Sequence, residues 1–297
     1  MASPARSGYA GLRMSRTRFP RPLRAALALC LAALGGAPAA ASDDCPPGMV
    51  LVEGGTLRGR GIDGYRVPSF CLDRTEVTVN AYAACVDLKV CDASGLVCGA
   101  AATWGKRNQG TFPVNCVTWA EAEKYCSEHG LRLPAEEEFE WAARGGERAF
   151  RYPWGNGAPA SRVCWDGEGN TKGKGERKGP CAVATHPRGR SPNGLDDLAG
   201  NVREWTSTEH ERFRVLRGGS WGDDRPDFLS ASFRGWNAPD ERMELLGFRC
   251  AAAVGTVAKE PTPPEEARAA TDDAGVMIFN EPIDTGPKKE APRRKRR

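Results

Sequence analysis

Histidine is scarce in this chain: of 297 residues only three are histidines, His129, His186 and His210. No two cysteines form a C-x-x-C pair. Zinc sites of cysteine and histidine need such close spacing, so the sequence excludes that type of site. Long apolar runs are also missing, because the longest one, residues 25–34, is too short to cross a bilayer as a helix. We therefore expect no transmembrane helix.

Acidic residues are absent from the first 41 positions, which carry six arginines. The apolar run at 25–34 follows these arginines, and small residues at 37–41 come next. A basic segment, a short apolar segment and a small-residue cleavage site predict a secretory signal peptide over residues 1–41. The alternative is a disordered N-terminal tail. Removing six arginines changes the formal net charge from +4 to about −2, so the composition does not indicate a nucleic-acid partner.

Cysteine, in contrast, is plentiful, and ten of the eleven cysteines follow the predicted signal peptide. An even number of cysteines in an exported chain predicts a disulfide framework. The ten are Cys45, Cys71, Cys85, Cys91, Cys98, Cys116, Cys126, Cys164, Cys181 and Cys250. We therefore expect a periplasmic or secreted protein cross-linked by disulfides.

The rest of the chain divides into two parts by composition. Residues 42–254 contain all of these cysteines together with the tryptophans, and their length is enough to bury one sizeable core. Residues 255–297 are rich in proline and charge, contain no cysteine, and end in five consecutive basic residues. Low hydrophobicity and many charges predict a disordered tail. Its basic end could contact an anionic surface, although a solvated tail is the simpler interpretation.

Few regular elements are predicted within residues 42–254. Thr78 suits the N-cap of a helix, Thr118 and Glu121 form a capping-box pattern for a second helix that ends at Gly130, and Pro134 suits the start of a third. Short strands are expected at 49–52, 65–72, 213–217 and 248–253. Glycine, proline, asparagine and aspartate interrupt the remainder so often that we expect an irregular α+β fold.

Eight segments, in order, resemble the sulfatase-modifying-factor domain, which is the fold of the formylglycine-generating enzyme. They are GMVLVEGG (48–55), DRTEVT (73–78), PVNCVTW (113–119), RLPAEEEFEWAARGG (132–146), YPWGN (152–156), NGLDDLAGNVREW (193–205), LRGGSW (216–221) and GFRC (247–250). The resemblance implies a loop-rich α+β fold related to C-type lectins. It also implies an enzyme that oxidises a cysteine of an unfolded sulfatase to formylglycine, using copper(I) and dioxygen.

The sequence departs from this family at the copper site. Family enzymes hold the metal with two cysteines shortly after the Gly-Gly-Ser-aromatic motif, but no cysteine lies between Cys181 and Cys250 here. Asp223 and, approximately, Phe228 occupy the places of the two thiols. Copper(I) prefers soft thiolates, aspartate is a hard ligand and phenylalanine is none. We expect no copper and assign no catalytic residue.

A related branch of the family uses non-haem iron held by three histidines from an additional helical domain. The three histidines of this chain are scattered and no such domain is present, so we do not expect an iron site.

One family calcium site has matching residues: Asp197, Gly200, Val202 and Glu204. Two carboxylates and two main-chain carbonyls from one tight loop suit calcium. The alternative is a turn whose carboxylates cap amides or pair with Arg203. We do not expect a second family calcium site, because a valine at position 163 stands about where an asparagine is needed.

Polar and aromatic residues gather in the sequence after the Gly-Gly-Ser-Trp motif. Trp221, Asp223, Asp224, Arg234 and Trp236 form a candidate pocket for a peptide or a sugar. The neighbouring Arg225 and Asp227 add further charge to this region. The alternative is a surface salt-bridge network beside two core tryptophans.

The family resemblance also implies one disulfide, Cys126–Cys250. For the remaining eight cysteines, proximity along the chain suggests Cys45–Cys71, Cys85–Cys91, Cys98–Cys116 and Cys164–Cys181. Eight cysteines allow 105 pairings, so this set is a hypothesis.

Three functions are consistent with these observations. The first, which we favour, is a monomeric scaffold that binds an extracytoplasmic protein, peptide or glycan without copper chemistry. The second is a protein-cysteine oxidase that makes formylglycine through other ligands. The third is a calcium-dependent, lectin-like binding module.

Overall fold

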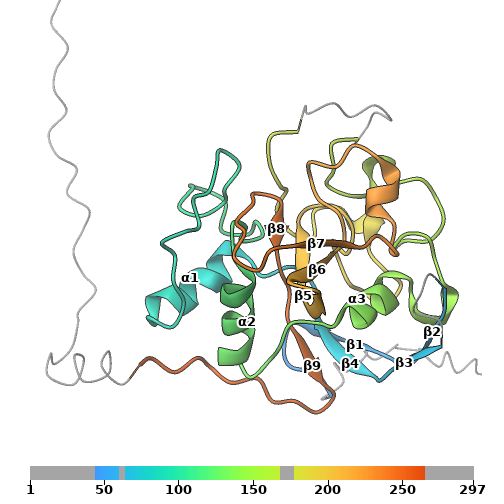
Figure 1. Ribbon diagram of the computed structural model, residues 1–297, viewed down its shortest axis with the longest axis horizontal. Coiled ribbons are helices and arrows are strands. Elements are labelled where there is room, and N and C mark those ends of the chain that lie inside the picture. Colours follow the sequence, from blue (N-terminus) through green and yellow to red (C-terminus); the bar gives the residue numbers. More distant parts are fainter. Residues whose placement is uncertain (1–43, 60–63, 168–176, 265–297) are drawn as a thin grey trace, which may run out of the picture. The chain divides into compact units, whose positions relative to one another are not determined.

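The computed structural model describes residues 44–59, 64–167 and 177–264 (Figure 1). The predicted signal peptide and most of the predicted charged tail lie outside these residues. Among the described residues, no helix is both long enough and apolar enough to cross a membrane.

A three-stranded antiparallel sheet contains both ends of the domain. β4 (Phe70–Asp73) lies in the middle, between β1 (Met49–Val52) and β9 (Ala251–Ala253). Just outside this sheet, the backbone N–H of Gly255 donates to the carbonyl of Asp44 at 2.8 Å. The first and last described segments of the domain therefore lie side by side.

A second sheet has the order β7-β6-β5-β8, and a third has β2 beside β3. The four strands of the second sheet are β5 (Arg203–His210), β6 (Phe213–Arg217), β7 (Gly235–Asn237) and β8 (Leu246–Gly247). β5 and β8 are parallel, whereas the other pairs are antiparallel. β2 (Gly55–Leu57) and β3 (Tyr65–Val67) form an antiparallel pair.

Three α-helices complete the regular structure: α1 (Val79–Asp87), α2 (Trp119–Glu128) and α3 (Glu136–Ala143). The predicted caps of the first two are present: the Thr78 hydroxyl accepts the N–H of Ala81, and Thr118 and Glu121 form the capping box. α3 begins two residues later than Pro134, because the Glu138 carboxylate accepts the N–H of Ala135 and fixes the first turn there.

Short 3-10 helices occur within the connecting loops. They are η1 (Gly146–Arg148), η2 (Ala160–Arg162), η3 (Pro187–Gly189) and η4 (Pro226–Leu229). Together with the short strands they give the irregular, loop-rich α+β fold expected from the sequence.

Two strand predictions were wrong in extent. The expected strand 65–72 is two strands, β3 and β4, separated at Pro68, which cannot donate to a ladder. The expected strand 248–253 is regular only over 251–253, because the preceding residues include Arg249, which is bound by its side chain in the core. Sequence analysis missed β5, the longest described strand.

Three apolar clusters lie within the described domain, and the two larger ones fill the space between these elements. One packs α1 and α2 against β5, β6 and β8, with Tyr82 stacked on Tyr125 at 5.6 Å and Phe248 edge-on to Tyr125 at 5.4 Å. The other packs β1, β4 and α3, with Phe139 and Trp141 of α3 fully buried against the sheet. The irregular loops between the strands are thus anchored to continuous cores.

Five disulfides cross-link the described domain, and they pair the cysteines as predicted. The bonds are Cys45–Cys71, Cys85–Cys91, Cys98–Cys116, Cys126–Cys250 and Cys164–Cys181. The bond with the largest sequence separation, Cys126–Cys250, joins α2 to the residue before β9. Each of the other four bonds closes a loop between cysteines that are at most 26 residues apart in the sequence.

Candidate functional site

Asp223, which we expected at the first thiol position, is buried and bound by the protein on both oxygens. One oxygen accepts the Ser220 N–H at 2.7 Å and the Ser220 hydroxyl at 2.9 Å. The other pairs with Arg203 of β5 at 2.5 Å. These charge-assisted contacts hold the side chain in one place and leave it no role as a free ligand.

Phe228, which we expected approximately at the second position, belongs to η4, and its ring makes apolar and cation–π contacts. Its ring lies edge-on to Phe233 at 5.4 Å, and the Arg225 guanidinium lies over it at 4.2 Å. All ten described cysteines are in disulfides. The donors at this position therefore do not fit copper(I), which needs free thiolates.

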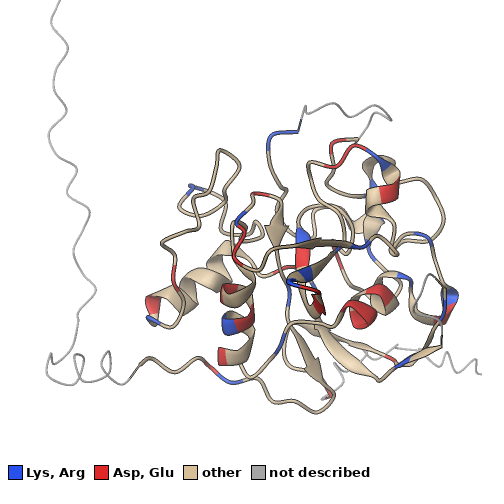
Figure 2. Cartoon of the chain, in the orientation of Figure 1, with Lys and Arg blue, Asp and Glu red and all other residues tan. Residues whose placement is uncertain are grey.

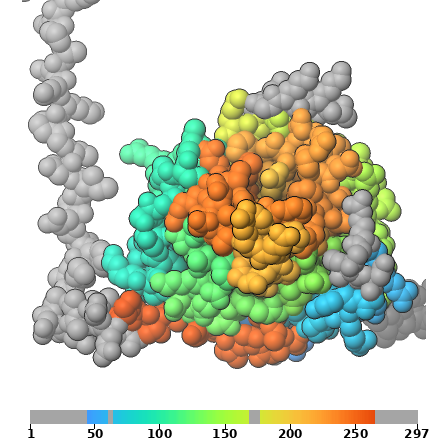
Figure 3. Space-filling view, viewed as in Figure 1, coloured from blue at the N-terminus to red at the C-terminus, as the bar shows by residue number. Residues whose placement is uncertain are grey.

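The residues of the predicted ligand pocket lie in separate settings. The Trp221 indole N–H donates to the Glu244 carbonyl at 3.0 Å, and Asp224 is exposed. Arg234 is held by Glu136 of α3 at 2.6 Å, and Trp236 is 50% exposed on β7 with its ring 4.6 Å from that of His210. Trp236 is thus not a core residue. Figure 3 shows the segments around residues 205–245, in yellow to orange, at the centre of this face.

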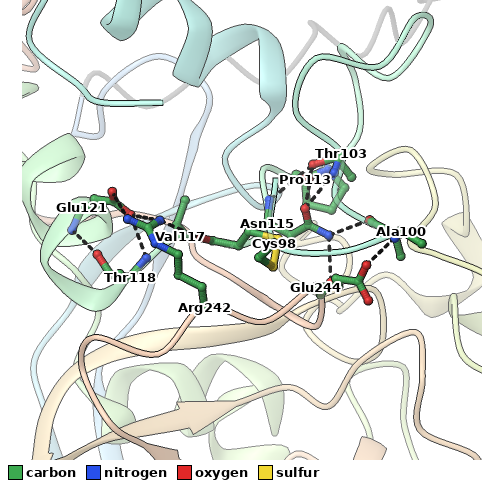
Figure 4. The surroundings of a disulfide bond; sticks show 12 residues. Cys98, Ala100, Thr103, Pro113, Asn115, Val117, Thr118, Glu121, Arg242 and Glu244 are labelled. Carbon is green, nitrogen blue, oxygen red and sulfur yellow. Dashed lines mark hydrogen bonds and ion pairs between the residues drawn. A yellow bond between two sulfur atoms is a disulfide. The ribbon is translucent and has the colours of Figure 1, made fainter. Parts of the chain in front are cut away.

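The loop closed by Cys98–Cys116 lies beside Glu244 and Arg242 (Figure 4). The Asn115 amide donates to the Glu244 carbonyl at 2.8 Å, the same carbonyl that accepts the Trp221 indole. Arg242 forms two hydrogen bonds with Glu121, at 2.6 and 2.7 Å, and a third with the Cys116 carbonyl. These contacts attach the disulfide loop and α2 to the segment that follows β7.

The predicted calcium residues lie on the tight turn that leads into β5. Asp197 and Gly200 have positive φ angles of 54° and 78°. A Cβ on Gly200 would come within 2.5 Å of the Cys164 carbonyl oxygen, so this position requires glycine. Asp197 accepts the N–H of Ala184 at 2.6 Å, and both oxygens of the fully buried Glu204 accept from Arg249 at 2.7 and 2.8 Å.

Glu76, which sequence analysis did not select, is buried beside this turn with neither oxygen hydrogen-bonded to any described residue. Burial raises the pKa of Glu76 well above its usual range, and the charge of Asp197 adds to the shift. Burial also raises the pKa of Asp197 and of Glu204, and brings that of Asp73 to about 7. Glu76, Asp197 and Glu204 are buried and Asp73 is half-buried, and the buried Arg249 is a cation that lowers the pKa of all four.

A bound divalent cation would hold acids of this kind in their charged form, against the effect of burial. Buried charges need a partner, and the orphaned Glu76 carboxylate has none in the described protein. Within the described residues no three His, Cys, Asp or Glu side chains are grouped to hold a metal ion. A calcium ion here would therefore depend on main-chain carbonyls, such as those of Gly200 and Val202, together with no more than two carboxylates, of which Glu76 and Asp197 are the candidates because Arg249 occupies both oxygens of Glu204.

A second ionic network connects α3 with the four-stranded sheet. The fully buried Arg217 of β6 contacts Glu136 at 2.7 Å and Glu140 at 3.0 Å. Arg234 contacts Glu136 from the other side, and Arg144 contacts Glu140 at 3.2 Å. Figure 2 shows these acidic residues along α3, in red. The network fixes α3 against β6 and occupies Arg234, which is why that arginine does not line a pocket with Trp221.

Comparison with known proteins is consistent with this geometry. The chain is 40% identical over 162 residues to the "Inactive C-alpha-formylglycine-generating enzyme 2" of Bos taurus, covering 51% of this chain and 54% of that protein. It is 35% identical over 173 residues to the "Formylglycine-generating enzyme" of Mus musculus, covering 49% and 45%. A "Hercynine oxygenase" of Mycolicibacterium thermoresistibile is 35% identical over 179 residues, covering 51% and 38%. The chain thus spans about half the length of the curated relatives it matches.

Solved structures agree on the fold. CarF has a TM-score of 0.54 at 23% identity, over 69% of this chain and 97% of that one. PvdO from Pseudomonas aeruginosa has a TM-score of 0.53 at 21% identity, over 69% and 94%. Residues 36–254 match the sulfatase-modifying factor enzyme 1-like domain. The chain belongs to the sulfatase-modifying factor enzyme 1-like family.

Proposed function

We propose that this protein is a non-oxidase member of its family that binds a partner protein, peptide or glycan outside the cytoplasm. The observation that carries the proposal is the ion pair of Asp223 with Arg203, because Asp223 is the residue that we expect at the position of the first copper thiol. Phe228 at the second position offers no ligand atom. The similarity to relatives named as inactive supports the same conclusion.

The disulfides support the proposed location. Five bonds within one domain are stable in an oxidising compartment and are rare in reducing cytosol. We therefore place the protein in the periplasm or the medium.

The test of the non-oxidase part is an incubation with a sulfatase-type Cys-x-Pro-x-Arg peptide, copper and oxygen, followed by mass spectrometry. The mouse formylglycine-generating enzyme serves as the positive control. We expect no aldehyde from this protein. Aldehyde formation that a copper chelator abolishes would contradict the proposal and favour the oxidase alternative.

The test of the binding part is capture from periplasmic or extracellular fractions on the immobilised domain. The same mouse enzyme, immobilised at equal density, is the control for the shared fold. We expect a protein, peptide or glycan that this domain retains and the control does not. Equal retention on both would count against a dedicated partner.

We further propose that a calcium ion binds at the turn before β5 and supports the structure there. The observation that favours it is the unpartnered, buried Glu76 carboxylate beside Asp197. An ion there would neutralise buried charge and hold the turn against β5. Calcium-dependent glycan binding, measured on arrays with and without chelator, tests whether the ion also serves a lectin-like function.

A further inference from the structure

A small hollow of about 190 Å³ includes neither Arg203 nor Asp223 among its lining residues. Two arginines, Arg144 at the end of α3 and Arg151, line it together with Asn156 and Ser232. No aspartate or glutamate is among its lining residues. A larger hollow of about 480 Å³ nearby differs in this respect, since Glu53 and Glu147 line it beside Arg148. The small hollow is therefore the more positive of the two.

The polar side chains that line the small hollow have hydrogen-bond donors that no described residue uses. Arg144 uses only Nη1 among its described contacts, donating to the Arg58 carbonyl at 2.6 Å and to Glu140 at 3.2 Å. Glu140 also pairs with Arg217, so its single negative charge does not fully neutralise the charge of Arg144. The remaining guanidinium N–H groups of Arg144 are available to a ligand.

Asn156 and Arg151 are arranged in the same way. The Asn156 side-chain oxygen accepts the backbone N–H of Arg151 at 2.9 Å, which leaves the Asn156 NH2 group as a donor. Arg151 pairs with Asp227 at 2.9 Å, but both side chains are largely exposed, at 57% and 80%, so this pair is weak and easily exchanged. The Ser232 hydroxyl has no partner within the described part of the chain.

We propose that this hollow binds an oxyanion group of the sulfate or phosphate class, carried on a larger ligand. Its donors come from three separate segments: Arg144 just after α3, the loop at 151–156, and Ser232. Donors from several segments suit the tetrahedral oxygens of a sulfate or phosphate group better than the coplanar oxygens of a carboxylate. Two arginines supply the charge-assisted hydrogen bonds that such oxyanions favour. A volume of about 190 Å³ also leaves room for part of the group that carries the anion. This site is independent of the proposed function.

The test is calorimetric titration of the full domain with phenyl sulfate and with phenyl phosphate at constant ionic strength. Phenol is the neutral control and benzoate is the planar anionic control. We expect saturable binding of the sulfate or the phosphate, tighter than that of benzoate and absent for phenol. The two arms show which of the two oxyanions the hollow prefers.

The sharpest variant is Asn156→Asp. It keeps an oxygen to accept the Arg151 N–H but replaces the donor with a carboxylate, so the loop should fold while the oxyanion is repelled. We expect Asn156→Asp and Arg151→Gln each to weaken binding by about tenfold or more. Arg148→Gln removes a nearby arginine that does not line this hollow, and should bind as the wild type does.

Absence of saturable binding, or equal binding of benzoate, would overturn the proposal. So would equal losses in Arg148→Gln and Arg151→Gln, because they would show only a general effect of positive charge. An unchanged melting temperature for Asn156→Asp separates a lost site from a lost fold.

Discussion

Replacing Arg249 with methionine should cost this domain a large part of its stability. Arg249 is fully buried and donates to both oxygens of the equally buried Glu204. It also donates to the carbonyls of Asp73, Arg74 and Asp196. One guanidinium thus connects β4, the turn before β5 and the segment that precedes β9.

The expected magnitude follows from these contacts. Removing one partner of a buried ion pair leaves the other charge uncompensated and costs about 3–5 kcal/mol. The three carbonyls also lose a donor, so the upper part of this range applies. Because domains are stable by only about 5–15 kcal/mol, this loss should be obvious in urea unfolding followed by tryptophan fluorescence with the disulfides intact.

The dependence on pH gives a second readout. Burial already raises the pKa of Glu204 even with Arg249 present, and without Arg249 the pKa should rise further. The folded variant would then hold a proton that the unfolded chain releases above a pKa of about 4.3. The stability of Arg249→Met should therefore fall as pH rises, and its deficit relative to the wild type should shrink toward pH 4.

Arg74→Met is the matched control. Arg74 is 49% exposed, and its partner Asp196 keeps a second contact with Arg190. We expect a loss below about 1 kcal/mol. If Arg249→Met loses no more than Arg74→Met, or if its deficit does not change with pH, the buried pair is not a major support of the fold. Adding Glu204→Gln should restore part of the lost stability.

Two further predictions concern the calcium turn and the disulfides. Calcium at 100 times its Kd should stabilise the domain by about 2.7 kcal/mol over chelator. Glu76→Gln should reduce this gain, because it removes a carboxylate that the ion would contact, and it should make the stability of the calcium-free domain less dependent on pH, because burial raises the pKa of Glu76 in the folded state. Thermal unfolding that is identical with and without calcium would refute the ion. Replacing both cysteines of Cys126–Cys250 by alanine should lower the free energy of unfolding by about 5 kcal/mol, against about 2.4 kcal/mol for Cys85–Cys91. The reason is that Cys126–Cys250 closes a much longer loop in the unfolded chain. Equal losses in urea unfolding would contradict this ranking.

Local chemistry made several elements predictable. Thr118 and Glu121 are three residues apart and satisfy each other's backbone donors, so the start of α2 needs no distant partner. The same is true of Thr78 before α1. Four of the five disulfides join cysteines that are near in sequence, and for these bonds proximity was a sufficient guide.

The buried charges could not be predicted in this way. Arg249 and Glu204 are 45 residues apart, and Arg217 and Glu136 are 81 residues apart. Nothing near either residue in the sequence indicates its partner. Arg234 looked available for a ligand because Glu136, which holds it, lies 98 residues earlier. The candidate pocket was assembled from residues that are near in sequence. It therefore left out the distant partners, such as Glu136, that hold those residues in separate places.

The hydrogen bond between Gly255 and Asp44 has an engineering consequence. Because the two ends of the domain leave the same sheet together, a host protein could carry the whole domain as an insert in one surface loop, with little separation of the loop's two sides. Likewise, a short linker could join the two ends, and new termini could then be opened in an exposed loop. Such a circular permutant should keep all five disulfides, since none of them requires the original chain order.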